Sequence, residues 1–107
     1  MINVEALNEV LGGDTDCVKE LMAMYLDINA EVGSTLDEHY RSHNTEALFH
    51  ALHTLSGMLS NLCEEDAVAI IKEAEMTSQA GELPSQQQMA VIKQHLLEIE
   101  GQVRLLV

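Results

Sequence analysis

The residue of this chain best placed to do chemistry is His53. It lies in residues 48–62, where apolar side chains recur with the period of a helix that is buried along one side. At roughly 100° per residue, His53 lies about 160° from the centre of this apolar stripe, so its imidazole is predicted to face solvent. An exposed imidazole is partly unprotonated near neutral pH and can act as a nucleophile, for example toward a phosphoryl group.

Gly57 follows His53 by one helical turn on the same predicted side. Glycine within a helix costs about 1 kcal/mol relative to alanine, so its position needs a reason. One reason is that the absent side chain lets a partner protein approach the imidazole closely. The other is close packing between crossing helices. Because the periodicity places Gly57 outward, we favour the first interpretation.

Four further side chains are expected around the imidazole on this exposed side: Phe49, His50, Ser56 and Ser60. An exposed aromatic residue in a chain with few aromatics often marks a protein interface. Partial burial of Phe49 against the preceding helix is the equal alternative.

The run His53-Thr54-Leu55-Ser56-Gly57, with Asn61 further on, resembles the phosphoacceptor motif of histidine-containing phosphotransfer (HPt) domains, which reads His-x-Leu-Lys-Gly before small residues. Residues 11–14, Leu-Gly-Gly-Asp, and the amphipathic segment after them match the usual start of such domains. The resemblance therefore covers nearly the whole chain, and residues 1–107 are expected to form one HPt-like domain. Two positions depart from the pattern: Ser56 stands where lysine is usual, and Cys63 where glycine commonly follows.

The resemblance implies a phosphorelay intermediate of two-component signalling. His53 would accept a phosphoryl group from a receiver-domain aspartyl phosphate and pass it to another receiver aspartate. The implied partners are response-regulator receiver domains, with a hybrid sensor histidine kinase as a further candidate. The receiver would supply Mg²⁺, so neither a cofactor nor kinase activity is expected of this chain.

Two more residues take their interpretation from the same resemblance. Glu75 lies 22 residues after His53, where the family often carries Glu or Gln on the neighbouring helix. It would hydrogen-bond the proximal imidazole nitrogen and hold the ring; the alternative is an exposed glutamate without a role. Asn61 is expected to be a structural hydrogen-bonding group. At position 56, a lysine would lie beside the phosphoryl oxygens, whereas serine offers only a hydroxyl.

Two other readings of the chain remain open. A helical adaptor would dock receiver domains with the same surface and relay nothing. A metal-binding bundle would use His39 with His43, or His50 with His53, since both pairs have helical spacing. Neither pair has an obvious third ligand, so no metal site is expected.

The elements that position these residues are predicted to be helices throughout. We expect an all-α, antiparallel four-helix bundle with a short additional N-terminal helix across one end. Asp14, Asn44 and the Ser85/Gln88 capping box should begin three of the four long helices. The fourth should span residues 66–79. The helix after Asp14 should be interrupted at Gly33-Ser34, with a bend, and should continue through Leu36 to about Tyr40.

Composition supports this fold class and narrows the partners. Hydrophobic residues make up 47% of the 107-residue chain and aromatics only 3%, which suits a helical core of aliphatic side chains. The net charge of −13 argues against binding to nucleic acid or an anionic membrane and suits a monomer that meets proteins transiently. Two cysteines without a disulfide framework, and no apparent signal peptide, lead us to expect a cytoplasmic protein.

Overall fold

The computed structural model describes residues 2–106, and over that range all regular secondary structure is helical. The helices are α1 (Val4–Val10), α2 (Thr15–Arg41), α3 (Thr45–Asn61), α4 (Asp66–Gln79) and α5 (Gln86–Leu106). The all-α prediction is confirmed. Within residues 2–106, none of these helices has the length and apolarity needed to cross a bilayer.

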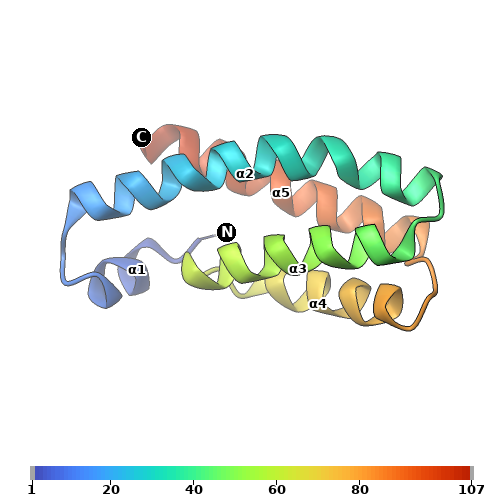
Figure 1. Ribbon diagram of the computed structural model, residues 1–107. Helices are drawn as coiled ribbons and strands as arrows, with labels where there is room; N and C mark the ends of the chain where they lie inside the picture. Colours follow the sequence, from blue (N-terminus) through green and yellow to red (C-terminus); the bar gives the residue numbers. More distant parts are fainter. Residues whose placement is uncertain (1, 107) are drawn as a thin grey trace.

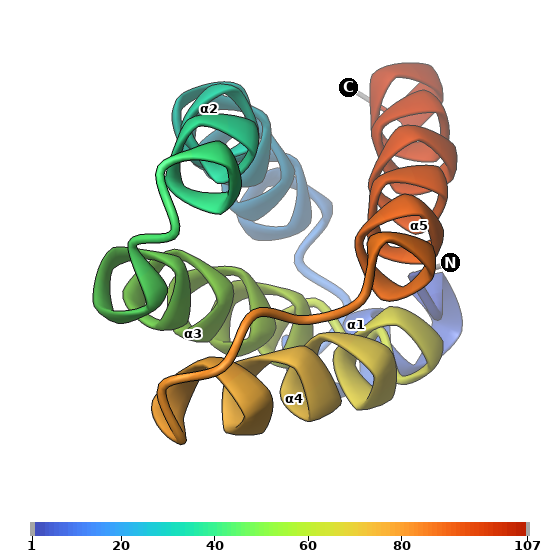
Figure 2. The same ribbon diagram turned by 90° about the vertical axis from the view of Figure 1, so that its right-hand side faces the viewer.

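The four longer helices lie alongside one another, and α1 lies at one end (Figure 1). In Figure 1, α2 leads away from α1, α3 returns toward it, α4 leads away again and α5 returns. The view along the helices shows α3 between α2 and α4, with α5 on the other side of α4 (Figure 2). Helix α3 packs most extensively against α4 and next against α2. The helix that carries His53 is therefore supported on both flanks.

The expected caps are present at the starts of the long helices. Asp14 and Asn44 each accept hydrogen bonds from backbone N–H groups in the first turn of α2 and α3, with N–O distances of 3.1 Å. Ser85 and Gln88 form the predicted capping box before α5, since each backbone N–H donates to the other's side chain at 2.9 and 3.0 Å. Local sequence therefore determines where these helices begin.

Helix α2 runs without a break through Gly33 and Ser34 to Arg41, so the expected continuation to about Tyr40 is confirmed and the expected interruption at residues 33–34 is wrong. The Ser34 hydroxyl donates to the Glu31 carbonyl at 2.8 Å, within the helix. A single helical glycine costs only about 1 kcal/mol. Burial of a leucine side chain contributes roughly 1.5–3 kcal/mol, and Leu36 just beyond the glycine is 1% exposed. The packing energy of the second half of α2 therefore exceeds the cost of a glycine within the helix.

The core is built from the apolar stripes that the periodicity predicts. On α5, the apolar stripe is buried at five successive positions, Met89, Ile92, Leu96, Ile99 and Val103. On α3 and at its C-cap residue, one side is fully buried, at Leu48, Leu52, Leu55, Leu59 and Leu62. Because these five leucines fix the rotation of α3 about its axis, the opposite side of the helix must face solvent.

Hydrogen bonds away from His53 also tie distant parts of the chain together. The Ile2 backbone N–H donates to Gln102 Oε1 at 2.8 Å, and Gln102 Nε2 donates back to the Ile2 carbonyl at 2.9 Å. The Tyr40 hydroxyl donates to the Pro84 carbonyl at 2.9 Å, which links the end of α2 to the loop before α5. The first contact fastens the start of the described chain to the last helix.

Candidate functional site

His53 lies on the outer side of α3, where its side chain is 70% exposed. Its Nδ1 is hydrogen-bonded to Oε1 of Glu75 on α4. An ionised carboxylate can only accept a hydrogen bond, so Nδ1 carries the proton and donates it. In the neutral imidazole the lone pair then resides on Nε2. The contact thus fixes the tautomer in which the distal nitrogen is the nucleophile.

Glu75 is a buried carboxylate, only 9% exposed, at the edge of the α3–α4 interface. The alternative of an exposed glutamate without a contact is wrong, and the predicted hydrogen bond to the proximal nitrogen is confirmed. Its neighbours in α4, Ala74 and Ser78, are also buried, so the carboxylate projects from a packed surface. Burial restricts the rotamers of Glu75, and its hydrogen bond to Nδ1 in turn restricts the orientation of the imidazole.

Phe49 lies one turn before His53, and its ring stacks on the imidazole with centroids 5.8 Å apart and planes 23° apart. It also contacts the His50 ring at 5.3 Å and 59°. Phe49 is half-buried, whereas His50 is exposed. The imidazole of His53 is therefore held along one edge by a carboxylate and on one face by an aromatic ring.

Gly57 is exposed one turn after His53, and a Cβ atom built there would have no heavy atom of another helix or loop within 4 Å. The alternative of a packing glycine between crossing helices is wrong. Ser60 and Asn61 are exposed as well. The surface beside the imidazole is thus open, as the periodicity predicts.

Ser56 does not lie on this exposed side. It is 3% exposed, and its hydroxyl donates to the His53 backbone carbonyl at 3.0 Å. The expectation that Ser56 stands in solvent beside the acceptor is wrong. Ser60, one turn after Ser56, borders a hollow together with Val68, Ala69 and Lys72 of α4, which indicates that Ser56 lies on the flank of α3 that α4 covers. Periodicity of α3 alone does not reveal which flank that is.

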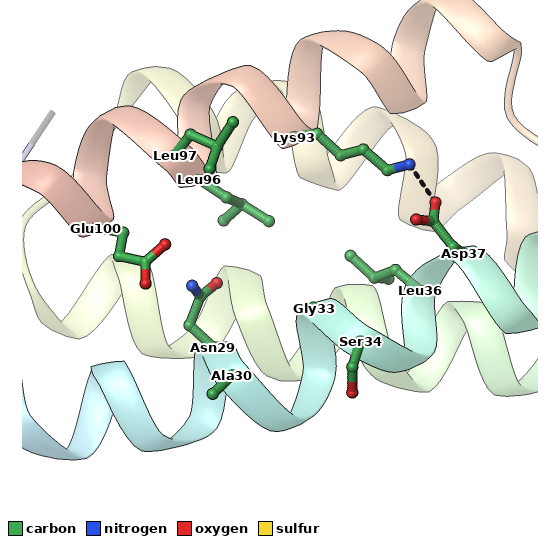
Figure 3. Close-up of a pocket in the computed structure, with 10 residues that line it drawn as sticks. All are labelled: Asn29, Ala30, Gly33, Ser34, Leu36, Asp37, Lys93, Leu96, Leu97 and Glu100. Atoms are coloured by element: carbon green, nitrogen blue, oxygen red, sulfur yellow. Dashed lines mark ion pairs between the residues drawn. The ribbon is translucent and has the colours of Figure 1, made fainter.

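A separate cleft of about 320 Å³ lies between α2 and α5 (Figure 3). Lys93 and Asp37 form an ion pair across one end of it, and Asn29 and Glu100 project near the other. None of the residues around His53 lines this cleft. Among the described residues, no group of three or more His, Cys, Asp or Glu side chains is arranged to hold a metal ion.

Comparisons of the chain with protein-family models, with curated proteins and with solved structures found no match. A function is therefore inferred from the side chains around His53. They form an exposed, oriented imidazole whose distal nitrogen is unprotonated in the neutral ring. That arrangement suits a histidine that takes up a group from a partner docked against α3.

Proposed function

We propose that this protein is a phosphorelay intermediate in which His53 carries the phosphoryl group. It takes that group from the aspartyl phosphate of one receiver domain and gives it to the aspartate of another. The observation that carries the proposal is the contact of His53 Nδ1 with Glu75, combined with the 70% exposure of the imidazole. Solvated surface histidines do not require a buried carboxylate partner on a neighbouring helix.

In the transfer step, the Nε2 lone pair attacks phosphorus and the bond from phosphorus to the aspartyl oxygen breaks. The electron pair of that bond leaves with the aspartate carboxylate. Because Nδ1 still holds its proton, the ring becomes a positively charged phosphoimidazolium. Glu75 accepts the Nδ1 proton in a hydrogen bond and offsets this charge. The reverse step follows the same path toward the second receiver.

The partner must supply the rest of the catalytic site, since His53 stands on a convex helix surface. A receiver domain provides Mg²⁺ and an acidic pocket around its aspartate, which neutralise the charge on the phosphoryl oxygens. This chain contributes a positioned nucleophile and a docking surface made of Phe49, His50, Gly57 and Ser60. The open space at Gly57 allows the partner backbone to approach.

We also propose how the helices are arranged, and in which compartment and with which partners the domain works. The four long helices form an antiparallel bundle, with α1 as the additional short helix. The domain works as a cytoplasmic monomer that binds receiver domains, and a hybrid sensor histidine kinase is a candidate carrier of the first receiver. The net charge of −13 favours transient encounters over self-association.

A transfer assay tests the proposal. Each receiver domain encoded in the same genome is phosphorylated with acetyl phosphate and Mg²⁺, purified and mixed with the protein. Acid-labile, alkali-stable label should appear on His53 with at least one receiver, and His53→Gln should take up none. Glutamine retains a donor for Glu75 and lies on an exposed face, so stability should change by about 0.5 kcal/mol or less.

The outcomes separate the proposal from its rival. Receiver binding without any transfer would replace it with the adaptor function. Label that persists in folded His53→Gln would assign the acceptor role to another histidine.

A further inference from the structure

Helices α3 and α4, which build the His53 site, carry one lysine, Lys72, and no arginine. The chain has five lysine and arginine residues. Lys93, drawn in Figure 3, and Arg104 are engaged in ion pairs with carboxylates, whereas Lys19 and Arg41 belong to α2. The fifth, Lys72, is an exposed residue of α4 and forms no ion pair with any other residue of the range 2–106.

The register of α3 against α4 brings Lys72 level with Ser56 along the two helices. His53 faces Glu75, and α3 and α4 run in opposite directions (Figure 1). A step forward along α3 therefore matches a step back along α4. Ser56 is three residues after His53, and Lys72 is three residues before Glu75. Three residues correspond to about 4.5 Å along each helix axis, within the span of an extended lysine stem.

A hollow of about 550 Å³, at the end of α3 and the start of α4 and bordered also by Asn3 and Ala6, is consistent with this register. Ser60 lines it from α3, and Val68, Ala69 and Lys72 line it from α4. Ser60 and Lys72 thus border the same open surface from the two helices, with the buried Ser56 one turn before Ser60. On α4, the positions of Lys72 and Glu75 are i, i+3 neighbours on one flank.

We infer that Lys72 binds the phosphoryl group carried by His53. This inference rests on the proposed function. A phosphoryl group brings about −1.5 to −2 charges at neutral pH, and it arrives beside the Glu75 carboxylate in a chain of net charge −13. The ammonium of Lys72 contacts the phosphoryl oxygens on Nε2 and offsets this charge. The cation thus comes from α4, level with the uncharged Ser56.

The test uses potassium phosphoramidate, a small donor that needs no receiver. The Nε2 lone pair attacks phosphorus and the phosphorus–nitrogen bond of the donor breaks; because the donor nitrogen is already protonated near neutral pH, it leaves as ammonia with the electron pair of that bond. Occupancy of His53 is read by mass spectrometry of peptides at neutral pH. The variants are Lys72→Gln, Lys72→Arg and Lys19→Gln, the last of which removes the same charge from an exposed position on α2.

Lys72→Gln should lower His53 occupancy about two- to fivefold at low salt, the range of a partly exposed ion pair. Lys72→Arg should restore most of it, and Lys19→Gln should match the wild type. The difference should shrink at about 0.5 M salt, where the screening length falls to a few ångströms. All variants should keep the wild-type melting temperature.

Different results would refute the role of Lys72 and the proposed relay function. Equal occupancy in Lys72→Gln and Lys19→Gln, or a loss that arginine does not rescue or salt does not weaken, overturns the role of Lys72 and leaves the relay standing. Labelling by phosphoramidate with no transfer from any receiver overturns the relay. Absence of His53 label from both donors overturns both.

Discussion

The carboxylate of Glu75 on α4 and the imidazole of His53 on α3 meet edge to edge across a helix–helix interface, although 22 residues separate them in sequence. Phe49 covers one face of the same ring. Two rigid elements and an aromatic neighbour thus restrict a side chain that would otherwise rotate freely in solvent. The contact fixes the direction of the distal nitrogen, and the imidazole stays 70% exposed.

Removal of this carboxylate should slow phosphoryl uptake while leaving the nucleophile in place. A hydrogen bond between charged and neutral groups contributes about 1.5 kcal/mol or more, so Glu75→Ala should reduce the transfer rate by roughly tenfold. Glu75→Gln keeps an acceptor oxygen but carries no charge, and its transfer rate should lie between those of the wild type and Glu75→Ala. The exposed Glu73→Ala on the same helix is the charge-matched control.

The tautomer provides a second measurement for the same variants. Imidazole ¹⁵N shifts should show the proton on Nδ1 in the wild-type protein and a redistribution toward Nε2 in Glu75→Ala. Unchanged shifts together with an unchanged rate would mean that the contact has no influence on the acceptor.

A side chain at Gly57 should block the partner without harming the fold. The space around its Cβ position is open, so Gly57→Leu should stabilise α3 by close to 1 kcal/mol through helix propensity. Transfer from a phosphorylated receiver should nevertheless fall by at least tenfold, because the leucine projects beside the imidazole. Gly101→Leu makes the same change at an equally open position of α5. If both leucine variants transfer at the wild-type rate, the partner does not approach over Gly57.

A lysine at position 56 should destabilise the protein. Ser56 is buried under α4, so a longer side chain must displace its neighbours and extend its ammonium outward. Overpacking of this kind typically costs about 1–3 kcal/mol. Ser56→Ala loses only the hydroxyl bond to the His53 carbonyl and should stay close to the wild type. Urea unfolding followed by circular dichroism measures both; equal midpoints would mean that position 56 opens readily to solvent.

The hydroxyl of Tyr25 is predicted to limit stability at alkaline pH. It is fully buried and has no hydrogen-bond partner within residues 2–106. Burial first, and then the carboxylates of Glu100 and Glu64, raise the pKa of the Tyr25 hydroxyl far above its usual value. The unfolded chain releases this proton near pH 10, whereas the folded protein retains it. Stability present below pH 10 is therefore lost as the pH rises further.

Tyr25→Phe removes both the unpaired hydroxyl and its titration. It should raise the free energy of unfolding by about 1 kcal/mol at pH 7, in line with the cost of a buried polar group without a partner. It should also flatten the fall in stability between pH 9 and 11. Tyr40→Phe, which removes the hydrogen bond to Pro84, should instead lower stability by about 1 kcal/mol. The same alkaline slope in Tyr25→Phe and wild type would exclude Tyr25 as its source.

Much of the fold is predictable because its determinants are local. Asp14 and Asn44 satisfy backbone groups two or three residues away, and a single-helix period identifies the buried leucines of α3. The interruption at Gly33 was predicted wrongly because a local preference of about 1 kcal/mol is smaller than the packing energy of the residues beyond it.

The site was predictable only in part, because its contacts cross between helices. Periodicity placed His53 and Gly57 in solvent, and both are exposed. It also placed Ser56 there, since rotation about one helix axis carries no information on which flank a neighbouring helix covers. Lys72 gave no signal of its own in the sequence. Its position level with Ser56 follows from the register of α3 against α4, which only the three-dimensional structure supplies.

The paired hydrogen bonds between Ile2 and Gln102 have a consequence for the order of folding. The other helix contacts largely join neighbours in the sequence, and such local topologies fold in microseconds to milliseconds. The Ile2–Gln102 contact instead closes a loop of 100 residues, whose entropic cost is met only once the intervening helices have shortened the distance. The amino-terminal segment should therefore dock after the transition state, and its release should be the first step by which the native molecule opens.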